Sequence, residues 1–369
     1  MTLLQTLLAP MLADAVAMAE EDLGRARDID VAMRLGARHQ SGPLEYLESL
    51  DQRDAERLLG RARPELPASE PDAPASSAPS VDGAFGVVGS GFMAAGIAYA
   101  AAVAGLDVVL AARTGDAGAA ANARIAVDLE QAVARGRMEE RAAHDALARV
   151  RVSTDLGTLA ECAIVVEAVA EDLAIKREVF AAIETVAGPS ALLASNTSSL
   201  LIADIAAATT SPQRVVGLHF FSPVRAMKLA EVVGTDAVPE ARLDELTGWA
   251  LRLGKVPVRS VDRNGFIVNR LLIPMLNDAA RAADAGLASV AEIDELMVAE
   301  AGHPIGPFAL LDLIGLDVTL AAQRSIHAAG DDPRLAPADG LVELVDAGRL
   351  GRKTGAGYHH YAATAGTTR

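Results

Sequence analysis

The first part of the chain carries apolar side chains at the spacing of one helix face. They recur every three or four positions, at Leu4, Leu7, Leu8, Met11, Leu12, Ala15 and Val16. An α-helix turns once in about 3.6 residues, so this spacing aligns the apolar side chains along one stripe. The pattern predicts an amphipathic helix that buries this stripe.

Short apolar runs alternate with helical stretches from about residue 82 onward. The runs that predict buried strands are 84–88, 107–112, 163–169, 191–194 and 215–220, and a helix of small residues is predicted at 92–104. Such alternation is typical of an α/β fold with a doubly wound parallel sheet. From residue 264 the pattern becomes helical again, which predicts an all-α domain after the sheet.

Part of the sequence occurs twice. Leu7–Leu47 aligns without a gap onto Leu271–Leu311, at an offset of 264 residues and with 17 identities over 41 positions. The identities include Pro10, Asp14 and His39. Two similar helix patterns alone would not keep Pro, Asp and His in register, so we predict a duplicated N-terminal helical unit in front of the middle domain.

A proline-rich segment separates the front unit from the middle domain. Residues 64–80 are PELPASEPDAPASSAPS, a composition that buries too little apolar surface to offset its ordering entropy. We expect an extended linker here. The predicted organisation is a helical unit at 1–63, a linker at 64–81, a nucleotide-binding domain at 82–262 and a helical domain at 263–369.

Composition and charge exclude several classes of partner. The 369 residues are 51% hydrophobic and 22% charged, with a net charge of −16, which would repel nucleic acid or an anionic membrane surface. The single cysteine, Cys162, excludes an intrachain disulfide and a cysteine-based zinc site, and we predict no metal. No basic residue precedes the apolar N-terminus, so we expect no signal peptide and a cytoplasmic protein.

The first predicted strand ends in a glycine-rich turn. Gly89, Gly91, Phe92 and Met93 occupy the strand-to-helix junction, where glycines let a backbone approach a pyrophosphate at a helix N-terminus. The motif predicts a Rossmann-type site for a nicotinamide dinucleotide. The alternative is a tight turn that binds nothing.

The second predicted strand ends without the acidic residue that usually binds the adenosine ribose. Ala112 stands at that place and Arg113 follows it. A carboxylate there favours NAD, whereas an arginine can pair with the 2′-phosphate of NADP. A solvated loop charge is an equally good interpretation of Arg113, so NAD and NADP both stay open at this point.

From about residue 82 to 358 the chain resembles the L-3-hydroxyacyl-CoA dehydrogenases, which include 3-hydroxybutyryl-CoA dehydrogenases. The shared motifs are GVVGSGFMAAGIA at 86–98, EAVAED with a lysine at 167–176, SNTSSL at 195–200, HFFSPVRAMKLAEVV at 219–233, KVPV and DRNGFIVNRLLIPML at 255–276, GHPIGPF at 302–308 and GRKTGAGY at 351–358. The resemblance implies hydride transfer between C3 of a short L-3-hydroxyacyl thioester and a nicotinamide cofactor. The cofactor that members of this family usually use is NAD.

The resemblance also implies a catalytic pair. His219 matches the family's general base, which takes the proton of the 3-hydroxyl, and imidazole suits this task because its pKa lies near working pH. Glu231 matches the carboxylate that orients the histidine. The two residues lie on a predicted strand–loop–strand segment, so they can lie side by side.

Further site residues are implied by the same motifs. Ser198 and Asn269 match side chains that hydrogen-bond the reacting oxygen, and the alternatives are a helix cap for Ser198 and a satisfied interdomain amide for Asn269. Glu171, Lys176 and Lys353 match contacts on the cofactor side.

The chain departs from the family pattern near the thioester. Ser222 replaces an asparagine, and the helix predicted at 122–137, which should contact coenzyme A, carries Asp128 and Glu130 among its arginines. A weaker hold on coenzyme A leaves an acyl carrier protein as an alternative partner, with a 3-hydroxyacyl unit such as a glyceryl group for polyketide extender units. A third interpretation is a catalytically silent nucleotide-binding scaffold, against which the joint presence of Ser198, His219, Glu231 and Asn269 argues.

The repeat predicts how the chain assembles. Members of the family usually dimerise through their C-terminal helical domains, and the front copy carries a closely similar apolar face. We expect residues 1–63 to pack on the helical domain of the same chain, as a monomeric pseudo-dimer. The alternative is a homodimer in which helical units pair across two chains.

Overall fold

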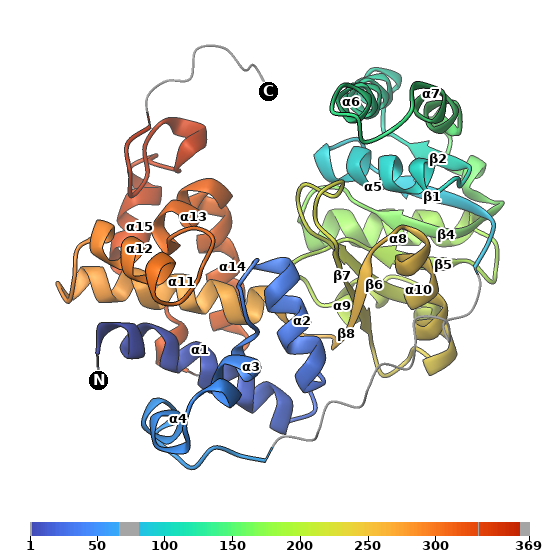
Figure 1. Ribbon diagram of the computed structural model, residues 1–369. Helices are drawn as coiled ribbons and strands as arrows, with labels where there is room; N and C mark the ends of the chain where they lie inside the picture. Colours follow the sequence, from blue (N-terminus) through green and yellow to red (C-terminus); the bar gives the residue numbers. More distant parts are fainter. Residues whose placement is uncertain (1, 66–80, 331, 362–369) are drawn as a thin grey trace. The chain divides into compact units, whose positions relative to one another are not determined.

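The computed structural model describes residues 2–65, 81–330 and 332–361. These residues form two compact units, one built from Met1–Ser69 with Asn264–Arg369 and the other from Glu70–Arg263. Most of the expected linker, from residue 66 to residue 80, lies outside the described residues. Figure 1 colours the chain along its sequence, so that the first and last parts of the helical unit are blue and orange to red.

The unit of residues 70–263 contains an eight-stranded sheet in the order β3-β2-β1-β4-β5-β6-β7-β8. The strands are β1 (Ala84–Val88), β2 (Val108–Ala111), β3 (Val150–Ser153), β4 (Cys162–Glu167), β5 (Leu192–Ser195), β6 (Val215–Phe220), β7 (Leu229–Gly234) and β8 (Val256–Val261). The helical segments are α5 (Phe92–Val103), α6 (Gly115–Ala134), α7 (Glu140–Ala148), η2 (Leu156–Leu159), α8 (Leu173–Val186), α9 (Ile202–Ala206), η3 (Pro212–Arg214) and α10 (Glu240–Arg252). The predicted α/β fold with a doubly wound sheet is confirmed.

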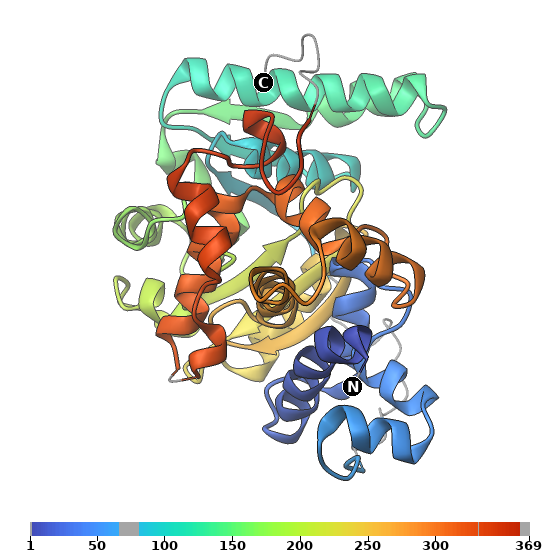
Figure 2. The same cartoon turned by 90° about the vertical axis from the view of Figure 1, so that its left-hand side faces the viewer.

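The unit of residues 70–263 differs from the prediction in several places, and β3 and β8 are strands that the sequence pattern did not predict. β7 runs antiparallel to β6, because the loop between them is too short for a crossover, whereas every other neighbouring pair is parallel. Helix α6 begins at Gly115 rather than at residue 122, since Thr114 caps its N-terminus by accepting a hydrogen bond from the Ala117 amide. α6 packs against β3 and lies along that edge of the sheet at the top of Figure 2.

Alternate side chains of the strands point to opposite faces of the sheet. On one face Phe85, Leu218 and Phe220 belong to a single apolar core with α5 and α10, and the Phe85 ring meets Trp249 edge-on at 5.8 Å between centroids. The residue between Leu218 and Phe220 is His219, whose side chain is therefore directed to the other face. α9 covers that face, since a Cβ on Gly217 would touch Ile202.

The other unit is helical. Its front part contains α1 (Leu3–Glu20), α2 (Ala26–Gly36), α3 (Pro43–Ser49) and α4 (Gln52–Leu59). Its second part contains α11 (Val268–Asp284), α12 (Val290–Ala299), α13 (Pro307–Ile314), α14 (Leu316–Ala328), η4 (Pro333–Leu335), α15 (Asp339–Asp346) and η5 (Arg352–Thr354). α1 packs against α11 and lies beside it in Figure 1.

Among the described helices, only α1 is long and apolar enough to cross a membrane by length and composition. Its apolar stripe is used inside the unit, because Leu8, Met11, Leu12 and Ala15 are all buried. This is the behaviour of a core helix, and it agrees with the amphipathic helix that the spacing of these residues predicts.

Candidate active site

The turn between β1 and α5 is shaped for a close backbone approach. Gly89 has φ +134°, and a Cβ there would lie 2.5 Å from the carbonyl oxygen of Ala168, so only glycine fits. Gly91 precedes the first turn of α5 and faces open space where a side chain would stand. Phe92 beside it is 57% exposed. The open space and the helix N-terminus together fit a dinucleotide's pyrophosphate.

The end of β2 lacks an acceptor for ribose hydroxyls. Ala112 follows the last residue of β2 and is buried, and its amide donates to the Ser153 carbonyl oxygen at 2.9 Å. Arg113 is exposed and stands just before the Thr114 cap of α6. The position where a carboxylate would bind the ribose thus presents a methyl group and, next to it, a guanidinium.

His219 and Glu231 face each other across the antiparallel pair β6–β7. The strand register pairs the two residues directly, and His219 Nδ1 lies 2.6 Å from Glu231 Oε2. Glu231 is fully buried and His219 is 6% exposed. With the carboxylate ionised, Nδ1 is the protonated nitrogen that donates to it, which directs proton-transfer chemistry to Nε2. The structure brings together the pair that the sequence predicts.

Glu171 organises the loop that carries Ser198. One oxygen, Oε1, accepts hydrogen bonds from the Thr197 hydroxyl at 2.7 Å and from the amides of Ser198 and Ser199 at 2.8 and 3.1 Å. It also accepts from both serine hydroxyls, at 3.3 and 3.0 Å. Burial opposes ionisation of this carboxyl, but Lys176 and these donors outweigh it and lower the pKa of Glu171. Glu171 is therefore an anion that fixes the serine loop.

Lys176 lies beneath this loop, in a buried ion pair that sequence reasoning missed. Its Nζ is 2.8 Å from Glu167 Oε1 and 3.3 Å from Glu171 Oε2, and the side chain is 1% exposed. Glu167, at the end of β4, also accepts from the Ser195 hydroxyl at 2.7 Å. The structure thus gives Lys176 a supporting position, and its predicted contact with the cofactor stays a prediction.

Asn196 ties the serine loop to the strand of His219. Its side-chain oxygen accepts a hydrogen bond from the Phe220 amide at 2.9 Å. Because β4, β5 and β6 are parallel neighbours, their carboxyl ends meet at one edge of the sheet, and that edge holds Glu167, the serine loop and Phe220. The SNTSSL motif contains Asn196, but nothing in a single sequence shows which amide accepts which hydrogen bond.

Lys255 fixes the loop between β6 and β7. Its Nζ donates to the carbonyl oxygens of Val224 and Met227, at 2.5 and 2.9 Å. Burial, with a smaller effect from Lys228, lowers the pKa of Lys255 to about 8. Ser222, the predicted substrate contact, is exposed at the start of the same loop.

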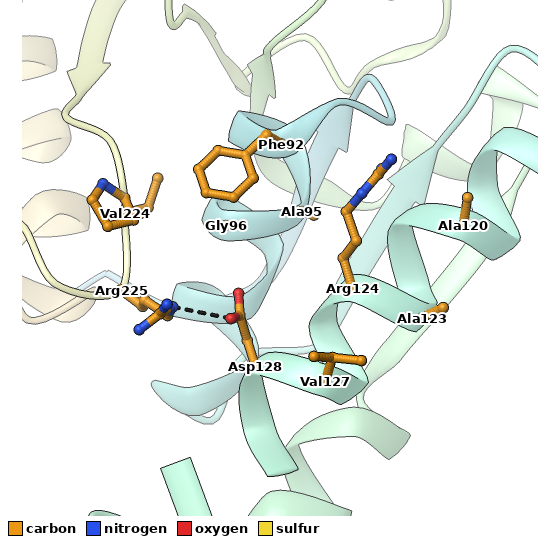
Figure 3. A pocket seen from close by; sticks show the side chains of 11 residues that line it. Phe92, Ala95, Gly96, Ala120, Ala123, Arg124, Val127, Asp128, Val224 and Arg225 are labelled. Carbon is orange, nitrogen blue, oxygen red and sulfur yellow. Dashed lines mark ion pairs between the residues drawn. The ribbon is translucent and has the colours of Figure 1, made fainter. Parts of the chain in front are cut away.

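A cleft of about 280 Å³ lies between α5, α6 and this loop (Figure 3). Apolar atoms dominate its walls, which are formed by Phe92, Ala95, Gly96, Ala120, Ala123, Arg124, Val127, Asp128, Pro223, Val224 and Arg225. The Arg225–Asp128 ion pair, at 3.0 Å, bridges the loop and α6, and Arg124 donates to the Ser90 carbonyl oxygen. Asp128 and Arg124, both on α6, thus each have a partner at the edge of the cleft.

Two predicted site residues belong to the helical unit. Asn269 lies in the first turn of α11, after the left-handed turn at Gly265. Lys353 lies in η5, and its Nζ is 2.5 Å from Asp317 Oδ1. Their parts in catalysis and cofactor binding rest on the motif resemblance. No cluster of three or more His, Cys, Asp or Glu side chains that could hold a metal ion occurs among the described residues.

Known proteins match this chain along both units. Two family models fit it, "3-hydroxyacyl-CoA dehydrogenase, NAD binding domain" over residues 84–263 and "3-hydroxyacyl-CoA dehydrogenase, C-terminal domain" over 265–361. A 3-hydroxybutyryl-CoA dehydrogenase of Mycobacterium tuberculosis is 43% identical over 280 residues, 75% of this chain and 97% of that protein. The human mitochondrial hydroxyacyl-coenzyme A dehydrogenase is 40% identical over 282 residues, 74% and 90% of the two chains. The crystal structure of (S)-3-hydroxybutyryl-CoA dehydrogenase from Ralstonia eutropha matches with TM-score 0.74 and 39% identity, covering 76% and 99%.

Proposed function

Because the chain belongs to the 3-hydroxyacyl-CoA dehydrogenase family, we propose that it oxidises short L-3-hydroxyacyl-CoA thioesters, or reduces the 3-keto forms. The buried His219–Glu231 pair is the observation that carries this proposal. A neutral imidazole held by a carboxylate is a general base that works near neutral pH.

His219 takes the proton of the substrate's 3-hydroxyl on Nε2 while the C3–H bond breaks. The turn of Gly89 and Gly91 would hold NAD, which would supply the acceptor for the hydride that leaves C3. Glu231 keeps Nδ1 protonated and stabilises the imidazolium that forms, as the carboxylate does in other acid–base pairs. By the motif resemblance, Ser198 donates a hydrogen bond to the reacting oxygen, where negative charge develops, in exchange for its 3.3 Å hydrogen bond to Glu171, and the same role for Asn269 stays a prediction.

The cleft beside Phe92 is the place for the thioester end of the substrate. Its apolar walls suit the alkyl part of a pantetheine arm, and it is lined by α6, the helix on which coenzyme A contacts are expected. The relatives are named for CoA substrates, and nothing favours a carrier protein, so we do not propose the carrier-protein alternative.

The cofactor proposal is NAD with weakened discrimination against NADP. The family model that matches residues 84–263 is named for NAD binding. Ala112 removes the acidic group that would repel a 2′-phosphate, and Arg113 next to it supplies a positive charge. A cytoplasmic location is also part of the proposal, because α1 buries its apolar stripe within its own unit.

Turnover of 3-hydroxybutyryl-CoA by the full chain, followed through the absorbance of the reduced nicotinamide, tests the proposal. We expect turnover with NAD and a measurable rate with NADP. His219→Gln is the matched control, and it should bind NAD and lose turnover. A chain that binds NAD but turns over no 3-hydroxyacyl-CoA of any tested length would be a silent scaffold, and the proposal would fail.

A further inference from the structure

The front helices and the C-terminal helices have the same plan. At the offset of 264 residues Ala26, the first residue of α2, corresponds to Val290, the first residue of α12. The starts of α3 and α13, at Pro43 and Pro307, and the starts of α4 and α14 correspond in the same way. α1 and α11 both contain a proline, at the equivalent positions 10 and 274.

The same local hydrogen bonds recur in both copies. Asp30 accepts from the amides of Leu44 and Glu45 at 2.8 and 3.2 Å, and Asp294 accepts from Phe308 and Ala309 at the same two distances. The left-handed turns also recur. Asp22 and Arg38 have φ +54° and +61°, and the equivalent residues, Gly286 and Gly302, have +67° and +68°. The two copies thus share backbone conformation as well as sequence.

Equivalent residues of the two copies meet each other. His39 stacks on His303, its own counterpart, with 3.9 Å between ring centroids and 18° between planes. Asp14 and Asp278, another equivalent pair, share the guanidinium of Arg334 at 2.5 and 2.8 Å. The stacking of His39 on its counterpart and the packing of α1 on the equivalent helix α11 indicate an approximate two-fold relation, and a two-fold contact is isologous, so both copies use the same face.

We infer that the front unit occupies, within one chain, a self-complementary face of the C-terminal helices that would otherwise bind a second copy of the chain. The front unit fits this face because it is itself a copy of the surface that an isologous dimer would offer. Covalent connection raises its local concentration to about the millimolar range, which favours the contact within one chain.

The front copy keeps the packing residues and changes others. Gln5 stands at the position equivalent to Asn269, and its side chain instead accepts a hydrogen bond from the Thr2 amide at 3.0 Å, in the cap of α1. Ala13 stands at the position of Asn277, whose amide group in the second copy binds Ala336 and Ala338. The front copy thus lacks both asparagines, while the residues at the two-fold contact, His39 and Asp14, remain.

Sedimentation analysis of the full chain and of a chain that begins at Ser80 tests the inference. The truncated chain can fold, because the alignment with the M. tuberculosis relative covers 97% of that protein but only 75% of this chain. We expect the full chain to stay a monomer of 38.1 kDa over a wide concentration range. The truncated chain should have twice the mass of its own monomer.

A charge at the two-fold contact separates this inference from nonspecific association. In the truncated chain, His303→Glu would place two carboxylates against each other, and the dimer should become a monomer. In the full chain the same substitution faces His39, and the protein should stay monomeric. His144→Glu changes an exposed histidine of α7 and should leave both masses unchanged. A soluble monomeric truncated chain, a dimeric full chain, or a truncated dimer that tolerates His303→Glu would overturn the inference.

Discussion

Lys176 Nζ lies 2.8 Å from Glu167 Oε1 with both side chains almost completely buried. Burying two charges costs desolvation energy, and additional hydrogen bonds to the charged groups offset part of this cost. Glu167 accepts such a hydrogen bond from the Ser195 hydroxyl. Lys176 Nζ also lies 3.3 Å from Glu171 Oε2, and the other oxygen of Glu171 accepts hydrogen bonds from the loop of Ser198. The ion pair therefore supports the predicted site from below.

Replacing Lys176 by methionine should destabilise the protein by about 3–5 kcal/mol, because it leaves buried Glu167 without its cation. Denaturant unfolding of the nucleotide-binding unit measures this loss. The double variant Glu167→Gln/Lys176→Met should lose much less than the sum of the two single variants. A loss below about 1 kcal/mol for Lys176→Met would mean that the pair is not a structural support.

The sequence could predict that Lys176 matters but not where it lies. Its motif placed it near the cofactor. Glu167 is only nine residues away, but the buried pair is completed by Ser195, which lies 28 residues from Glu167 across the parallel pairing of β4 with β5. The pairing of His219 with Glu231 was predictable because a short loop joins their strands and fixes their register. Local spacing thus predicts neighbours across a hairpin better than neighbours across a crossover.

The pair of His219 and Glu231 predicts a non-additive loss of activity. His219→Gln should lower kcat by a factor of about 10²–10⁴ and leave the affinity for NAD nearly unchanged, because the general base is lost and the turn at Gly89 is not. Glu231→Gln acts through the same imidazole, so the double variant should be little slower than His219→Gln. Steady-state rates and NAD titrations measure both quantities. Near-normal turnover by His219→Gln would contradict the assignment of the base.

Ala112 predicts how cofactor preference can be shifted. Ala112→Asp places a carboxylate at the end of β2, where it can accept from the ribose hydroxyls of NAD and repel the 2′-phosphate of NADP. The ratio of kcat/KM for NAD over NADP should rise by about tenfold or more, which corresponds to about 1.4 kcal/mol. Arg113→Ala should raise the ratio by lowering activity with NADP. A strict preference for NAD in the unchanged protein, unaffected by Arg113→Ala, would contradict the prediction.

The helical repeat and the packing of its two copies could be predicted from the sequence, but the residues that form the contact could not. Identities at Asp14 and His39 indicated a shared unit, and only the structure shows that each of these residues meets its counterpart or shares one arginine with it. Arg334 has no equivalent in the front copy. No periodicity predicts that it bridges Asp14 and Asp278, which are separated by 264 positions.

The stacked histidines predict a loss of stability in acid. Burial, with a smaller effect from His303, lowers the pKa of His39 to about 3, and burial lowers the pKa of His303 to about 4. The unfolded chain binds protons at these histidines below about pH 6.5, while the folded chain binds them only near pH 3–4. The two histidines therefore leave the free energy of unfolding unchanged above about pH 6.5 and lower it progressively as the pH drops below that value.

At about pH 5 each histidine should lower the free energy of unfolding by about 2 kcal/mol relative to neutral pH. Asp278 works in the opposite direction, because burial, against the attraction of Arg334, raises its pKa to about 6 and the folded chain gains a proton first. The double variant His39→Gln/His303→Gln removes the histidine contribution and keeps that of Asp278. Unfolding free energies of both proteins at pH 7 and pH 5 should show a larger acid loss in the unchanged protein. Equal losses would show that the stacked pair does not titrate on unfolding in this range.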